Sequence, residues 1–297
     1  MQLKQIIQNV EGVLRRPLLL CLVMMLADIM YTHADTLERL SYEALIDSAE
    51  YYSQRSDWKR AEKLTVEALR RKPASASNWI LWSNLAEIRS RMGDVDGALD
   101  AYDIGLSQRP ESMTLHKGRA ALYISEGRNK DAIEDLEAVL KSDSIAEWPL
   151  MMHGMLMLGN SQDEKAEEDF TLLAKSHPSN AQAYSGLANI AARKGDVKSA
   201  LKYYDKALEI EPDENIYFYK VTLQADNDLL PQAAETLREA MKKYPRNGNL
   251  FLLRAYLHKL NFQYNEMEIA LKLAKEYEAD ENLIHSLFPQ NPNNKKK

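Results

Sequence analysis

Small and apolar residues recur along the chain with a fixed period. Four alanines follow one another at intervals of 34 residues, namely Ala98, Ala132, Ala166 and Ala200. Prolines run in the same frame at Pro110, Pro178 and Pro212, where the first interval is twice 34 residues. Self-similarity at a period of this length is typical of stacked-repeat architectures. The spacing therefore predicts a series of similar modules.

Each period predicts two helices joined by a short turn. The period around Ala200 has, in order, Tyr184, Leu187, Ala188, Gly195, Asp196, Ala200, Tyr204, Ala207 and Pro212. The small residues are expected where two helices approach most closely. A glycine such as Gly195 supplies the positive backbone dihedral that ends the first helix, and the proline cannot continue the second. No alternating β-branched run of strand length competes, so the predicted fold class is all-α.

This pattern resembles the tetratricopeptide repeat, a family of helix–turn–helix modules. The resemblance implies a right-handed α-solenoid of about seven repeats, from Tyr42 to Ala279, with weaker terminal copies that act as caps. The predicted domain boundaries place the solenoid at residues 35–279. Residues 280–297 are expected to begin as an apolar cap on the last repeat and to end as a disordered tail.

The first 34 residues do not belong to the repeat pattern. Basic residues precede an apolar run, Pro17 to Ala27, and a polar stretch follows. This order is typical of a secretory signal peptide, with cleavage expected after Ala34. The alternatives are an uncleaved N-terminal membrane anchor, lipid attachment at Cys21 and a buried helical cap. The predicted location is therefore periplasmic or secreted, with membrane anchoring through this segment as the alternative.

The composition and the motifs of the sequence disfavour several classes of function, catalysis among them. The formal net charge of −6 disfavours a general binder of nucleic acids or anionic membranes. Cys21 is the single cysteine, so a cleaved chain would have no disulfide or thiolate zinc site. No two of the six histidines have metal-ligand spacing on one helix; His153, among apolar neighbours, is expected to be a satisfied core residue. Phosphate loops and nucleophile elbows are also absent from the sequence. We expect no enzyme activity, no cofactor and no metal.

In the family that the chain resembles, the first helix of each repeat lines a concave groove. Its second, fifth, ninth and twelfth positions supply most of the groove residues. The first repeat offers Ile46 and Glu50 there, and the Ala98 repeat offers Ile80, Ser83, Glu87 and Ser90. Some members grip the acidic C-termini of heat-shock chaperones with clustered lysines, asparagines and an arginine. That clamp is not assembled here, so binding of such tails is disfavoured.

The first helix of the Ala166 repeat is unusually apolar. Residues 148–158 have almost no polar face, whereas an amphipathic helix has one. One hypothesis is that an exposed apolar patch seats an apolar partner segment, since methionine-rich surfaces adapt to varied partners. The alternative is that this helix is buried all round. The predicted groove residues are Trp148, Met151, Met155, Leu158, Asn189 and Phe218.

These observations predict a non-catalytic protein–protein interaction scaffold in the cell envelope or outside the cell. It would bind a protein or peptide segment in the concave groove. The alternative is an accessory subunit of an envelope enzyme or assembly complex, and an enzyme of unrecognised type is a weaker third hypothesis.

Overall fold

The computed structural model describes residues 39–289, and these contain fifteen α-helices and no strand. Its contacts divide the chain into two compact units, Met1–Ser142 and Asp143–Lys297. The helices of the first unit are α3 (Tyr42–Gln54), α4 (Trp58–Arg71), α5 (Asn78–Arg91), α6 (Val95–Gln108), α7 (Met113–Ser125) and α8 (Asn129–Ser142). Those of the second are α9 (Glu147–Gly159), α10 (Asp163–Ser176), α11 (Ala181–Arg193), α12 (Val197–Ile210), α13 (Glu214–Asp226), α14 (Leu230–Lys243), α15 (Gly248–Leu260), α16 (Tyr264–Glu276) and α17 (Glu281–Leu287).

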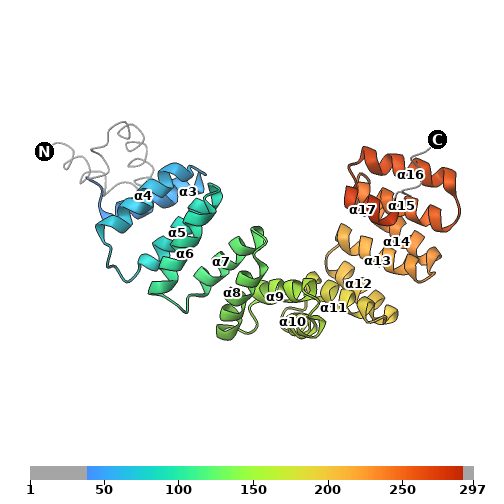
Figure 1. Cartoon of the computed structure of the whole chain (residues 1–297), viewed down its shortest axis with the longest axis horizontal. Helices are drawn as coiled ribbons and strands as arrows, with labels where there is room; N and C mark the ends of the chain where they lie inside the picture. Colours follow the sequence, from blue (N-terminus) through green and yellow to red (C-terminus); the bar gives the residue numbers. More distant parts are fainter. Residues whose placement is uncertain (1–38, 290–297) are drawn as a thin grey trace, which may run out of the picture. The chain divides into compact units, whose positions relative to one another are not determined.

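Consecutive helices pack against each other as pairs, beginning with α3 and α4 and ending with α15 and α16 (Figure 1). Each helix of a pair has 13 or 14 residues. We call the earlier member of a pair the first helix and the later member the second helix. The described residues hold seven pairs, which confirms the predicted all-α repeat architecture.

Burial of the alanine period agrees with the predicted close crossing of the two helices. In six of the seven second helices the fourth residue is a fully buried alanine: Ala61, Ala98, Ala132, Ala166, Ala200 and Ala233. The seventh, α16, has the half-buried Met267 at this position. Interiors are packed closely enough that an added methylene at such a crossing forces neighbouring side chains to move. The alanine period therefore marks positions at which the two helices of a pair are expected to be in contact.

Large residues fill the space between one pair and the next. Phe170 of α10 is almost fully buried and its ring lies against Gly186 of α11, where an added Cβ would come within 2.5 Å of ring carbons. Gly154 of α9 faces the same ring, at 3.1 Å from an added Cβ. A large residue in one pair thus requires small residues on the helices that flank it.

The turn between the two helices of a pair requires one left-handed residue. It lies two positions before the second helix, and it is glycine in three pairs: Gly93, Gly127 and Gly195. The other four pairs have Ser56, Ser161, Asp228 and Phe262 there, each with φ between 58° and 59°. Only the glycines were expected there from the sequence, because serine and phenylalanine rarely adopt a positive φ.

Polar side chains fix where the helices begin and how consecutive first helices align. Asp94 and Asp196 cap second helices by accepting a hydrogen bond from the backbone N–H three residues later. Asn180 caps α11 in the same way, and its Nδ2 also donates to Glu147 Oε1 at the start of α9, at 2.9 Å. Asn247 repeats this bond to Glu214, again 33 residues earlier.

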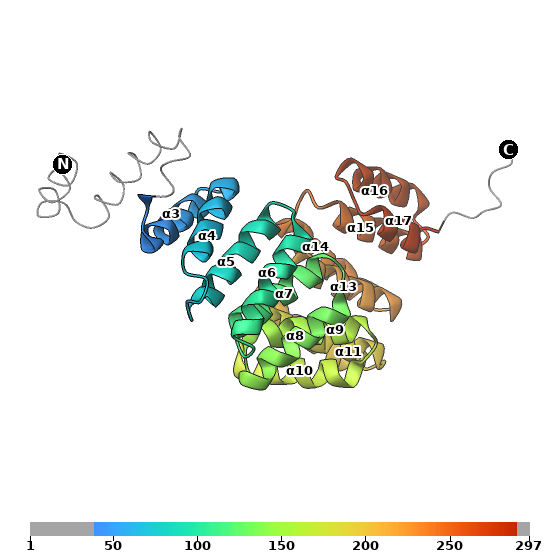
Figure 2. The same cartoon turned by 60° about the vertical axis from the view of Figure 1, so that its left-hand side comes forward.

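After the last pair, α17 lies beside α15 and α16 (Figures 1 and 2). Its Leu283 and Ile284 pack on the buried cluster formed by Phe251, Leu252 and Ala274. Lys259 Nζ of α15 donates to the carbonyl of Leu287 at 2.9 Å. The short helix therefore covers apolar surface that a further repeat would otherwise cover.

The predicted signal peptide and the end of the predicted tail lie outside the described residues. Within residues 39–289, no helix combines the length and the apolar character needed to cross a membrane.

Glycine substitutions separate backbone strain from packing. An added Cβ at Gly195 or at Gly159 meets nothing within 4 Å, but Gly195 has φ +78° and Gly159 lies in the last turn of α9. We expect Gly195→Ala to lower the free energy of unfolding by about 1 kcal/mol, because an L-residue is strained in the left-handed region. Gly159→Ala is the control and should leave stability unchanged or slightly raised. Urea unfolding followed by circular dichroism measures both, and equal effects would contradict the explanation.

Candidate binding surfaces on the first helices

A hollow with a volume of about 340 Å³ opens between α3, α4 and α5 in the first unit. It is lined by Ile46, Ala49, Glu50, Ser53, Gln54, Trp58, Thr65, Leu81, Asn84, Glu87 and Ile88. Nine of these residues come from the first helices α3 and α5, and two come from α4. The hollow therefore lies mainly between two first helices, and three of the residues that line it, Ile46, Glu50 and Glu87, occupy predicted groove positions.

The inner wall of this hollow is apolar and its rim is acidic. Leu81 and Ile88 are buried, and Ile46 and Trp58 are half-buried and pack against the core of the unit. Glu50 and Glu87 are exposed. Such a combination, an apolar wall with a few polar groups at its edge, is the usual composition of a ligand or peptide site.

The two carboxylates of the rim have only weak partners within the protein. Glu50 Oε1 accepts a hydrogen bond from Gln54 Nε2 at 3.3 Å. Glu87 pairs with Arg91 one turn away at 3.6 Å, and both side chains are more than 60% exposed. Exposed pairs of this kind contribute little because water screens them. Burial, with a smaller contribution from the negative charge of Glu87, raises the pKa of Tyr102 to about 12.

In the second unit, four of the predicted groove residues share one face of α9. The opposite face, with Leu150, His153 and Met157, is buried. Met155 is 47% exposed, and the other three residues of its stripe are partly exposed. They are Trp148, Met151 and Leu158. The face is apolar and accessible, and its role as a docking surface stays a prediction.

The remaining two predicted residues lie on other helices of the second unit. Asn189 of α11 is half-buried and accepts a hydrogen bond from the Tyr204 hydroxyl, so its carbonyl oxygen is already used. Phe218 of α13 lines a small hollow of about 70 Å³ that also involves Asn215, Asn249 and, from α17, Leu283. The structure therefore groups four of the six residues on one helix face and places the other two on separate helices.

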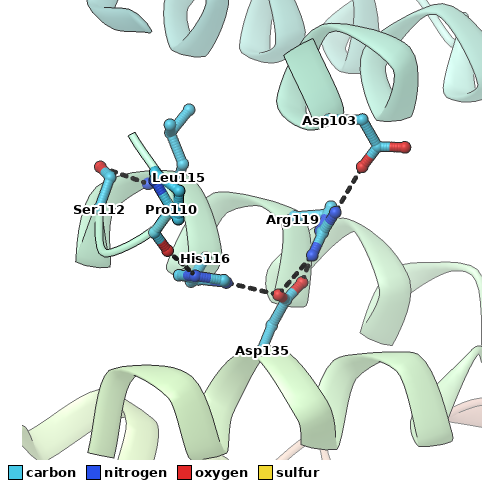
Figure 3. A network of polar contacts seen from close by, with 7 residues as sticks. All are labelled: Asp103, Pro110, Ser112, Leu115, His116, Arg119 and Asp135. Atoms are coloured by element: carbon cyan, nitrogen blue, oxygen red, sulfur yellow. Dashed lines mark hydrogen bonds and ion pairs between the residues drawn. The ribbon is translucent and has the colours of Figure 1, made fainter. Parts of the chain in front are cut away.

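Figure 3 shows the network of polar contacts between the second and third pairs. Asp135 of α8 is 2% exposed, and its carboxylate accepts two bonds from Arg119 of α7 at 2.8 Å and contacts His116 Nδ1 at 2.6 Å. Arg119 also pairs with Asp103 of α6. The hydrogen bonds to Asp135 are the largest cause of the raised pKa of Arg119. Because the groups bind one another, the network joins the helices α6, α7 and α8.

His153 lies in the core, as predicted. It is buried, and its Nδ1 lies 2.6 Å from Asp169 Oδ2 of α10. Among the described residues, no group of three or more histidine, cysteine, aspartate or glutamate side chains could hold a metal ion.

Comparison with known proteins decides the family. Two profiles described as tetratricopeptide repeat match residues 83–149 and 181–214. The chain is a tetratricopeptide-repeat protein. Repeats of this family are generally protein-interaction scaffolds, and their fold is typically non-catalytic.

Relatives share the repeats over part of their length. Human tetratricopeptide repeat protein 6 is 26% identical over 159 residues, which are 54% of this chain and 30% of the relative. Human DnaJ homolog subfamily C member 3 is 23% identical over 133 residues, which are 40% of this chain and 26% of the relative. The chain thus spans less than a third of the length of these relatives.

Solved structures show the same fold at low sequence identity. A tetratricopeptide repeat protein from Parabacteroides merdae matches with a TM-score of 0.67 at 23% identity, over 83% of this chain and 96% of the other. Pseudomonas aeruginosa pilF matches with a TM-score of 0.56 at 17% identity, over 70% and 96%. YrrB, described as having an unusual peptide-binding site, gives 0.52 at 19% identity, over 63% and 95%.

Most of the residues that line the hollow in the first unit were not predicted from the sequence. Of the four α5 positions expected to line the groove, Glu87 is the one that lines the hollow, together with Leu81, Asn84 and Ile88. The signal that was available is the pair Ile46 and Glu50, which occupy the expected positions of α3.

The buried carboxylate of Asp135 provides a stability test. Asp135→Ala leaves Arg119 largely buried without its main partner, so we expect the free energy of unfolding to fall by about 3 kcal/mol. Asp103→Ala removes an exposed carboxylate from the same arginine and should cost less than about 1 kcal/mol. Urea unfolding of the two variants measures the difference. Similar losses would show that the network does not depend on Asp135.

Proposed function

We propose that this tetratricopeptide-repeat protein is a non-catalytic scaffold that binds segments of a partner protein on the exposed faces of its first helices. The observation that carries the proposal is the hollow between α3 and α5, which combines an apolar wall with an accessible polar rim. The apolar wall supplies binding energy through the burial of apolar surface, and the polar groups of the rim supply selectivity.

The second unit supports the same proposal with different chemistry. The partly exposed face of α9, with Met155 at its centre, offers an apolar surface that needs no charged partner. Methionine side chains adapt to partners of varied shape. The structural neighbour YrrB is described as having an unusual peptide-binding site. We propose peptide binding for this chain as well.

The proposed compartment is the cell envelope or the space outside the cell. It rests on the sequence of residues 1–34 alone, with its basic start, apolar run and small residues before the polar chain. In that compartment the scaffold would act by itself or as an accessory subunit of an envelope assembly.

Site-specific photocrosslinking in the native host tests the proposal. A photoreactive amino acid at Gln54, on the rim of the hollow, or at Met155 should crosslink to a partner protein. The controls are exposed positions on second helices, Val66 of α4 and Ile269 of α16, and they should give no crosslink to that partner. Crosslinks from the second helices alone, or none from either first-helix position, would contradict the proposal.

A substitution control links the crosslink to binding. Met151→Asp combined with Leu158→Asp places two charges on the α9 face beside the photoreactive residue at position 155, and we expect it to weaken the crosslink from that position at least tenfold, since two desolvated charges cost more than about 1.4 kcal/mol. The circular dichroism melting curve should stay unchanged, because neither residue belongs to the buried face of α9.

A further inference from the structure

We propose that the hollow between α3 and α5 selects partner segments in which a lysine or arginine stands next to a large apolar residue. This inference rests on the proposed function and adds the chemistry of the partner. Its basis is the combination of charge, apolar surface and accessibility within one hollow of the first unit.

The charge of the hollow has one sign. Of the eleven described residues that line it, Glu50 and Glu87 are carboxylates and none is lysine, arginine or histidine. Both carboxylates are exposed at the rim, one on each of the two first helices. Two like charges that face a hollow with a low-dielectric wall attract a cation and repel an acidic segment.

Three arginines that are close in sequence to the lining residues do not neutralise the hollow firmly. Arg91 reaches Glu87 at 3.6 Å through an exposed pair on one helix. Arg55 lies over the ring of Tyr51, at 3.6 Å from the ring centroid, and Arg89 is bonded to Glu62 at 2.9 Å. A lysine or arginine from a partner therefore competes with one weak, solvent-screened pair.

The wall of the hollow suits the apolar part of the same segment. Leu81 and Ile88 close the inner side, and Ile46 and Trp58 are partly accessible. Lysine and arginine place their methylene stems along such surfaces while their charged ends stay in water. The face of a tryptophan ring also attracts cations. The hollow thus accommodates a basic side chain and an adjacent large apolar one.

The second unit offers a contrast within the same chain. The exposed stripe of α9, centred on Met155, consists of apolar side chains without charge. This stripe is therefore not expected to favour either basic or acidic segments of a partner, and charge substitutions in the first unit should leave binding to α9 unchanged.

Selection from a displayed random peptide library on the full-length chain tests the inference. Peptides of about ten residues are long enough to cross the hollow when extended. Enriched sequences are expected to contain lysine or arginine beside a large apolar residue. A synthetic copy of the most enriched peptide, carrying a fluorescent label, then gives the dissociation constant by anisotropy.

Matched variants locate the binding. Glu50→Lys with Glu87→Lys should lower the affinity for the synthetic peptide at least tenfold. Raising the salt concentration should lower the affinity of the unmodified chain. Asp100→Lys with Glu134→Lys makes the same change in net charge at exposed residues of the second helices α6 and α8 and should have less than a twofold effect. Asn84→Trp, which fills the hollow without adding charge, should also weaken the peptide tenfold.

Each other outcome overturns the inference in an identifiable way. Enrichment of acidic or purely apolar peptides that are still lost with Asn84→Trp would show that the hollow binds peptides of another class, and the proposed scaffold function would stand. Enriched peptides that lose affinity equally in the two charge-reversed variants would show that only net charge matters. If peptides are enriched no more strongly on the unmodified chain than on the Glu50→Lys, Glu87→Lys variant, the proposed selectivity of the hollow is wrong. The crosslinking experiment would then decide the scaffold function separately.

Discussion

The rest of the structure depends on the close contact between the two helices of each pair. The second helix has a fully buried alanine at its fourth position, such as Ala98 or Ala200, and packs against the first helix. Because there is no room for a larger side chain, the two helices are held at one distance and in one register. The same register decides which residues of the first helix point away from the contact and become available to a partner.

That register explains why the sequence predicts the fold so well. The alanine period marks the contacts directly, and the prediction of about seven pairs is confirmed. The turns were harder to predict, since Ser161 and Phe262 adopt the positive φ that glycine adopts elsewhere. The surrounding structure holds these residues in this conformation, and the residue type alone does not predict it.

The candidate site was less predictable for a related reason. A motif position describes one helix, whereas a hollow depends on how two first helices and the second helix between them come together. Trp58 begins α4 and still lines the hollow of α3 and α5. The network around Asp135 likewise joins residues of three helices. No spacing within one repeat shows such contacts between repeats.

The two units present different surfaces on the same type of helix. The first unit has a hollow with an acidic rim, and the second has the apolar stripe of α9. A scaffold with two chemically distinct surfaces can bind two kinds of segment, from one partner or from two. The repeats supply a common frame, and in the proposed function a few side chains on the first helices would determine what each unit binds.

The central claim is that binding occurs on the first helices, and methyl-resonance NMR tests it most directly. Ile46 and Ile88 line the hollow, while the exposed Ile104 lies on the second helix α6 of the same unit. On titration with a binding peptide, the account predicts saturable shifts of the Ile46 and Ile88 methyl signals and none of the Ile104 signal. Shifts of Ile104 without shifts of Ile46 and Ile88 would contradict it.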